Sequence, residues 1–295
     1  MKRNDILLPA LAVAGGGLGF GLRRWQLTTG YDPQTQLFLP SHPAIYALLL
    51  LTAVLALVIL VTIRQAKRPS DPISPFRCPC SSYMAGMASS GLFLLGAGVL
   101  GLLEGMRQLS AWKMDPESHL LTYPIAVFLC ALLCFVAGPA QLIVGREAYR
   151  GRLEENSSLL VVFPPIAALA WLFSFHLDHG TDPILMGYGI TLAAVSVLLL
   201  AHYEFAAFFH ERPHPRRAIF FALMGTYLSL VSLADLPSPF FLLLIAAFLL
   251  SSLSQGWALL RNTLGPPWPQ RLLKERMPSG AEKEGIVHTD QDTLN

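Results

Sequence analysis

The sequence predicts an all-α membrane protein: a polytopic bundle of eight transmembrane helices, arranged as four hairpins, with both termini cytoplasmic. Composition is the first observation, because the chain is 53% hydrophobic and 14% charged, with a mean hydropathy of +0.50. The second is a set of eight stretches without Asp, Glu, Lys or Arg: 6–22, 43–63, 84–103, 123–144, 159–175, 183–203, 218–234 and 239–260. Each is long enough to cross, or nearly cross, about 30 Å of hydrocarbon as a helix.

The distribution of basic residues predicts the orientation. Of the 21 Lys and Arg residues, 17 fall in the N-terminus, the even-numbered connections and the C-terminal tail. The other connections carry only four: Arg23, Arg24, Arg107 and Lys113. Positive residues accumulate on the cytoplasmic side of membrane proteins. The net charge of +2 is too small to indicate a nucleic-acid partner.

The first stretch has two interpretations. A basic start followed by Ala12-Val13-Ala14 is typical of a cleaved signal peptide. The apolar segment before that site, 6–11, is short, however, and apolar sequence continues to Leu22. We therefore expect this stretch to be retained as a helix. Cleavage, the alternative, leaves seven helices in the same orientation.

Prolines mark the start of each returning helix. The four pairs are His42-Pro43, Tyr123-Pro124, Asp182-Pro183 and Ser238-Pro239. Proline suits the first helical turn because its missing N–H has no intrahelical partner there. Asp182 and Ser238 are predicted to cap their helices by accepting a hydrogen bond from a free amide.

Glycine is concentrated in the first and third stretches, where the spacing predicts close helix packing. Three pairs lie four residues apart, which allows two backbones to approach: Gly15/Gly19, Gly17/Gly21 and Gly101/Gly105. We expect Gly17 and Gly101 to face other helices. A flexible gating helix is the alternative.

The bundle is expected to occupy residues 1–261, and residues 262–295 a cytoplasmic, disordered tail. Gly265-Pro266-Pro267-Trp268-Pro269 ends the last apolar stretch, and polar sequence follows it. Cys130 and Cys134 are predicted to be small packing residues, and Cys78 and Cys80 to be a reduced pair in a cytoplasmic connection.

Ionisable residues collect near the ends predicted to be external, and we group six of them as a candidate binding site in an outer vestibule. The six are Arg23, Glu104, Arg107, His176, Asp178 and Asp235. They lie at the ends of the first, third, fifth and seventh helices, which we expect to converge with the returning helices outside them. Glu104 and Arg107 are three residues apart and can pair on one helix face. His176 is expected to face the bundle axis. The alternative is ordinary solvation of charges at helix ends.

No metal site, cofactor or catalytic residue is predicted. Histidine and aspartate side chains can bind a metal ion, and four of them lie close together in the sequence: His176, Asp178, His179 and Asp182. Such groups also occur by chance in loops, so we do not predict a metal site here. His202 is the only histidine within one of the apolar stretches, whereas a membrane haem usually needs two on facing helices. We expect His202 and Glu204 to pair at the inner interface, with Arg146 or Arg216 as further partners.

A resemblance rests on several short motifs. Arg24-Trp25-Gln26-Leu27 follows the first stretch, and the later motifs are Trp171, His176, Asp182-Pro183, Tyr188, Tyr203, Arg216-Arg217 and Leu233-Ala234-Asp235. With these the chain resembles an uncharacterised group of bacterial multi-pass membrane proteins. The resemblance implies a bacterial plasma membrane and contributes no activity.

The predicted function is that of a non-enzymatic integral membrane protein, either permease-like for a small polar solute or a binding or scaffold component. Its predicted partners are the lipid bilayer and either a membrane protein or a second copy of the chain. A transport path would be lined by Gln141, Tyr188 and Tyr227. The alternative is an enzyme acting on a lipid or lipid-linked substrate at the outer face, with an acid or base among His176, Asp178 and Glu104. In that case Arg23, Arg24 and Arg107 would hold an anionic headgroup.

Overall fold

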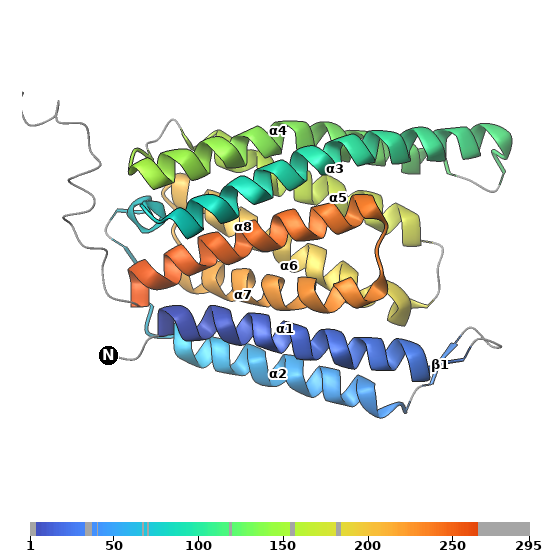
Figure 1. The fold of residues 1–295 in the computed structure, drawn as a ribbon, viewed down its shortest axis with the longest axis horizontal. Coiled ribbons are helices and arrows are strands. Elements are labelled where there is room, and N and C mark those ends of the chain that lie inside the picture. The colour runs from blue at the N-terminus through green and yellow to red at the C-terminus, as the bar shows by residue number, and fades with distance from the viewer. Residues whose placement is uncertain are drawn as a thin grey trace, which may run out of the picture.

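A computed structural model shows eight long helices packed side by side (Figure 1). It describes residues 4–32, 37–39, 41–66, 68–69, 71–117, 120–153, 157–180 and 184–264. Within these ranges, eight helices are long and apolar enough to cross a membrane. The all-α fold class is thus confirmed, and the chain is a multi-pass membrane protein by the length and composition of its helices.

The helices α1 to α8 follow the chain in order: Asn4–Thr29, Pro43–Ile63, Ser81–Met114, Thr122–Arg150, Phe163–His179, Leu185–Phe209, Pro215–Ser232 and Pro239–Leu264. The described residues also include three short 3-10 helices, namely η1 (Ser74–Phe76), η3 (Leu160–Val162) and η4 (Leu233–Asp235). Strands β1 (Tyr31–Asp32) and β2 (Leu37–Phe38) form a small antiparallel ladder between α1 and α2.

Several helices extend beyond the charge-free stretches. The third stretch, 84–103, lies within α3, which continues to Met114 and carries Glu104, Arg107 and Lys113. At about 1.5 Å per residue this helix is roughly 50 Å long, more than the thickness of the hydrocarbon layer. Charge ends the part of a helix that suits hydrocarbon, but it does not end the helix itself.

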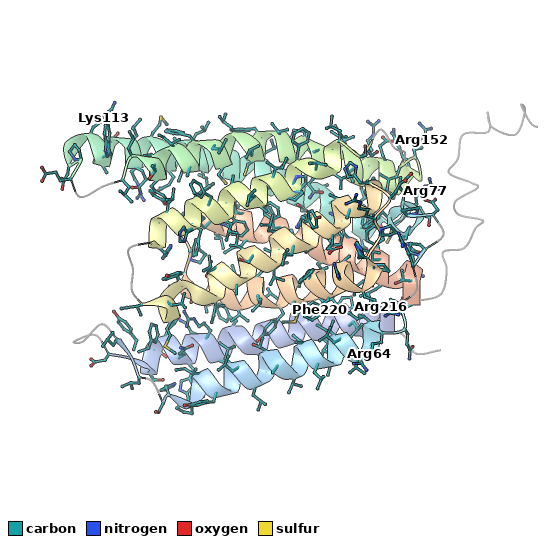
Figure 2. The ribbon with its side chains drawn as sticks, turned by 180° about the vertical axis from the view of Figure 1, so that it is seen from behind. Arg64, Arg77, Lys113, Arg152, Arg216 and Phe220 are labelled. Carbon is teal, nitrogen blue, oxygen red and sulfur yellow. The ribbon has the colours of Figure 1, made fainter. Side chains whose placement is uncertain are left out.

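The helix termini lie at two opposite ends of the bundle (Figure 1). The carboxyl ends of α1, α3, α5 and α7 and the amino ends of α2, α4, α6 and α8 share one end, which we call the Glu104 end, and the other termini share the Cys78 end. Arg64, Arg77, Arg152 and Arg216 all lie toward the Cys78 end, whereas Lys113 lies at the Glu104 end (Figure 2).

Helix α8 is, with α7, one of the two most buried membrane-spanning helices in the described part of the chain. It packs against α3, α7, α1 and α6, and α7 in turn packs against α6, α1 and α2. We expected the outgoing helices α1, α3, α5 and α7 to converge inside the returning ones, and this expectation is wrong, because α8 is a returning helix. The main neighbours of α3 are α4 and α8 rather than α5.

Helix α2 is the most apolar of the eight and also the least buried. Its outward side chains Leu49, Leu50 and Leu57 are each at least 62% exposed. An apolar surface of this kind suits lipid and not water. The outer face of α2 therefore fits a hydrocarbon environment.

Glycines allow α3 and α4 to approach closely. Gly91, Gly98 and Gly105 repeat every seven residues on α3, as do Ala131, Gly138 and Gly145 on α4. A Cβ atom added to Gly91 would lie 2.8 Å from the Gly138 carbonyl oxygen. The predicted contact of Gly101 is confirmed, since its added Cβ would lie 2.7 Å from the Phe240 ring.

The expectation for Gly17 is wrong. A Cβ atom at Gly17 or Gly21 would meet nothing within 4 Å, whereas one at Gly16 or Gly19 would lie 2.6 Å from a side chain of α7. Four-residue spacing identifies pairs that share a helix face, but it does not say which face meets another helix and which meets lipid.

Prolines lie in the first turn of three of the returning helices, as predicted, and Pro124 is the third residue of α4. Pro43 opens α2, where the His42 ring accepts a hydrogen bond from the Ala44 amide at 3.3 Å. Pro239 opens α8, and the Ser238 hydroxyl accepts one from the Phe241 amide at 3.5 Å, which confirms the predicted cap. The cap predicted at Asp182, with Pro183, lies outside the described residues, as does the tail from residue 265.

Candidate functional site

A buried ion pair joins α1 to the end of α7. Arg23 is 1% exposed, and its Nε donates to the Asp235 carboxylate at 2.7 Å. Its Nη1 donates to the Gln26 side chain at 3.0 Å, and its Nη2 donates to the carbonyls of Met186 and Gly187 at 2.9 Å each. All three guanidinium nitrogens therefore have partners inside the chain, which offsets the cost of burying the charge.

Asp235 is placed for this pairing by a tight turn. It is the last residue of η4, and the next residue, Leu236, has a left-handed backbone with φ of 52°. Its second carboxylate oxygen accepts a hydrogen bond from Thr191 of α6 at 2.9 Å. Asp235 thus links α7 to both α1 and α6.

A second charged group lies on α3. The Glu104 carboxylate accepts hydrogen bonds from Arg107 at 2.8 Å and from Gln108 at 2.7 Å. These residues are three and four positions further along the helix, so they share its face. The predicted pairing of Glu104 with Arg107 is confirmed. Gln108, which the sequence analysis did not select, could have been found by the same spacing.

A third group lies at the end of α5. The Asp178 carboxylate lies 3.7 Å from Nδ1 of His179 and interacts with the Tyr123 hydroxyl. Nδ1 of His179 also lies 3.2 Å from the Phe175 carbonyl oxygen. Because a carbonyl only accepts, this contact places a proton on Nδ1.

Aromatic rings adjoin these carboxylates. The Phe175 ring meets Phe241 at a centroid distance of 5.7 Å and an angle of 83°, and Tyr188 at 6.4 Å and 60°. The imidazole of His179 stacks on Phe175 at 4.4 Å and lies 5.0 Å from Tyr188. The rings come from α5, α6 and α8, which therefore meet at this point.

The three groups and the rings surround one cavity of about 300 Å³ at the Glu104 end, which we call the polar pocket. Its lining consists of Glu104, Arg107, Gln108, Tyr123, Phe175, Asp178, His179, Gly187, Tyr188, Thr191, Asp235, Leu236, Pro237, Ser238 and Phe241. Four of the six residues predicted for a vestibule, Glu104, Arg107, Asp178 and Asp235, are in this set. Arg23 lies behind Asp235 as its partner.

The expectation for His176 is wrong. Its side chain is exposed and does not line the polar pocket. Successive side chains turn by about 100° around a helix, so Phe175, Asp178 and His179 share a face that excludes His176. The residues that the sequence analysis missed here are neutral or aromatic, such as Tyr123 and Thr191, and no charge pattern distinguished them.

A separate buried polar cluster centres on Ser251 of α8. Its hydroxyl oxygen accepts from the side-chain amides of Gln141 at 2.8 Å and Gln255 at 2.9 Å. It also lies 3.0 Å from Nε2 of His202, whose Nδ1 lies 2.8 Å from the Leu198 carbonyl oxygen. Nδ1 must then carry the proton, so the Ser251 hydroxyl donates to Nε2. This Ser251 cluster ties α4, α6 and α8 together.

The expected pairing of His202 with Glu204 at the inner interface is wrong. Glu204 instead lies 3.3 Å from Nδ1 of His214, at the start of α7. Residues two apart on a helix point in different directions, which explains the separation of His202 from Glu204.

Three side chains were expected to line one transport path: Gln141, Tyr188 and Tyr227. They line three separate cavities. Tyr188 lines the polar pocket. Tyr227 lines a largely apolar cavity of about 310 Å³ between α1, α2, α6 and α7, and Gln141 lines a space of about 10 Å³ beside the Ser251 cluster. Among the described residues, no three His, Cys, Asp or Glu side chains are grouped to hold a metal ion.

Comparisons with protein-family models, with curated proteins and with solved structures find no match to this chain.

Proposed function

We propose that this chain is a non-enzymatic protein of a bacterial plasma membrane that binds a small polar solute in the polar pocket. The observation that carries the proposal is the pocket itself. Its lining residues come from α3, α4, α5, α6 and α8 and from the turn between α7 and α8, six segments that meet around one cavity. At about 300 Å³ it is at the small end of ligand-binding cavities.

We propose further that the helices form four hairpins with both termini cytoplasmic, so that the polar pocket faces outward. The distribution of basic residues supports this orientation. Arg64, Arg77, Arg152 and Arg216 lie toward the Cys78 end, and Lys113 lies at the other (Figure 2). Cytoplasmic connections are the ones enriched in Lys and Arg. The bacterial location is supported by the resemblance described above.

The hydrogen bonds of Arg23 favour a binding function over the enzymatic alternative. An enzyme for lipid-linked substrates was expected to use this residue to hold an anionic headgroup, but its guanidinium is fully engaged within the chain. His176, one of the expected acids or bases, faces away from the pocket. A permease-like role would require a continuous path, and the three side chains expected to line one lie in separate cavities.

The test is a binding screen on the full-length protein in lipid nanodiscs. Small anions, amines, polyols and sugars are added one by one, and the thermal unfolding midpoint is recorded. A solute that binds only the folded protein raises the midpoint in a concentration-dependent way. We expect at least one class to do so, and Asp178→Asn to reduce the shift.

Glu117→Gln is the matched control. Glu117 is an exposed carboxylate just beyond α3 at the same end of the bundle, and it does not line the polar pocket. Its removal should leave the shift unchanged. If no solute stabilises the protein, or if both variants respond equally, the polar pocket is not a binding site.

A further inference from the structure

Charge is unbalanced in the polar pocket. Three carboxylates line it, those of Glu104, Asp178 and Asp235. Arg107 pairs with the first and Arg23 with the third, at 2.8 Å and 2.7 Å. Among the described residues, no arginine or lysine forms an ion pair with Asp178, whose carboxylate lies beside the His179 ring and the Tyr123 hydroxyl. The carboxylates that line the pocket therefore outnumber the arginines paired with them by one.

Four aromatic side chains line the same cavity: Tyr123, Phe175, Tyr188 and Phe241. They come from four different helices, and Phe175 makes angles of 60° and 83° with two of the others. Phe175 also stacks on the His179 imidazole at 4.4 Å, so the lining holds a cluster of rings in mutual contact. The face of an aromatic ring attracts a cation, and cages of such rings recognise quaternary ammonium groups.

Size and charge together select the ligand class. A cavity of about 300 Å³ admits a ligand of few heavy atoms. A strongly hydrated metal ion would gain little from aromatic rings, and an anion would face the excess carboxylate. A small organic cation matches both the negative charge and the aromatic lining.

We propose that the polar pocket binds a small organic ammonium ion, with Asp178 as its counter-charge and the aromatic rings of the lining as its apolar contacts. This inference rests on the proposed function, since it names the class of solute for the same pocket. The cation lies within the cavity, in van der Waals contact with aromatic rings of its lining and close to the Asp178 carboxylate.

Binding is measured by calorimetry on the full-length protein in nanodiscs of neutral lipid, with choline and tetramethylammonium as probes. The matched ligand is 3,3-dimethylbutan-1-ol, which has the shape of choline without its charge. We expect choline to bind at least tenfold more tightly than this alcohol. Asp178→Asn should weaken choline binding at least tenfold, and Glu117→Gln should not change it.

The comparison of choline with its neutral analogue uses the wild-type protein, so it stands even if Asp178→Asn fails to fold. Equal affinity for the two ligands overturns the ammonium inference. Binding of an anion or a sugar that is sensitive to Asp178→Asn, without binding of either ammonium probe, overturns the inference but leaves the proposed function intact. Absence of binding by every class overturns both.

Discussion

The guanidinium of Arg23 and the carboxylate of Asp235 lie 2.7 Å apart although 212 residues separate them in the chain. The pair is almost inaccessible, with side-chain exposures of 1% and 13%. It fastens α1 to the turn that leads into α8, and Thr191 extends the link to α6. Because Asp235 also lines the polar pocket, the stability of the bundle and the shape of the pocket depend on the same side chain.

Removing one partner of this pair should strongly destabilise the protein. Arg23→Gln leaves the Asp235 carboxylate buried without its counter-ion, which typically costs about 3–5 kcal/mol. The free energy of unfolding is measured by titration with SDS from mixed micelles. The double variant Arg23→Gln with Asp235→Asn should lose less unfolding free energy than the two single variants lose in total.

Arg24→Gln is the control for this prediction. Arg24 is adjacent in sequence but exposed, so its replacement should change the unfolding free energy by less than about 0.5 kcal/mol. Equal losses at positions 23 and 24 would show that the buried pair contributes nothing specific.

The Ser251 cluster gives a prediction with an adjacent control. Ser251→Ala removes the atom that pairs with His202 and with both glutamine amides, so three buried polar groups lose a partner. The free energy of unfolding is expected to fall by about 1–3 kcal/mol. The Ser252 hydroxyl is also buried, but it has no hydrogen-bond partner among the described residues. Ser252→Ala should therefore be neutral or stabilising. If Ser252→Ala lowers the unfolding free energy more than Ser251→Ala does, the hydrogen bonds of the Ser251 cluster do not stabilise the protein as described.

The glycines of α1 separate a packed face from a face open to lipid. Gly16→Leu must displace Leu230, because its Cβ alone would lie 2.6 Å from that side chain. Overpacking of this kind costs about 1–3 kcal/mol. Gly17→Leu meets open space and should cause no such loss. The melting temperatures of the two variants are compared in detergent. A similar decrease for both would mean that α1 is packed differently.

The sequence predicted what depends on local pattern. Charge-free length predicted the eight helices, because hydrocarbon excludes charge over each span. Spacing of three residues predicted the Glu104–Arg107 pair, because both side chains belong to one turn of α3. The arrangement of the helices was not predictable in this way. A face that meets lipid is as apolar as a face that meets another helix, so Gly16 and Gly17 look alike in the sequence.

The polar pocket was predicted only in its charged residues, for a related reason. Helix ends are where charges normally lie, so position near an end does not show whether a side chain points inward. His176 and His179 illustrate this, because both are near the end of α5 and only His179 lines the cavity. The Ser251 cluster depends on three helices meeting at one depth, and no spacing within one helix encodes that.

The proposed orientation makes a topological prediction. A reporter inserted after Gly180, between α5 and α6, should be external, and one fused after Lys283, beyond the described residues, should be cytoplasmic. Paired alkaline phosphatase and fluorescent-protein fusions at each site measure this directly, because each reporter is active on only one side. Reporter activity in the reverse pattern would show that the bundle has the opposite orientation, with the polar pocket facing the cytoplasm.

Two cysteines at the Cys78 end should differ in reactivity. Cys78 is fully buried, and its amide donates to the Ala148 carbonyl at 3.1 Å, whereas Cys80 is only half-buried. Burial and, to a smaller extent, the neighbouring Cys80 raise the pKa of the Cys78 thiol to about 12. Because the thiolate is the reactive form, Cys78 should resist alkylation at pH 8 in the folded protein.

The same shift links the Cys78 thiol to stability. Its pKa is higher in the folded state than in the unfolded state, so its contribution to stability is complete below about pH 8.5 and is lost as the pH rises toward 12. Alkylation with N-ethylmaleimide at pH 8, read by mass spectrometry of the 78–80 peptide, should modify Cys80 first. Cys78 should react only after unfolding in SDS, and Cys80→Ser should leave the native protein almost unlabelled in this peptide. Rapid labelling of Cys78 in the folded protein would mean that the connection between α2 and α3 does not pack against α4 as described.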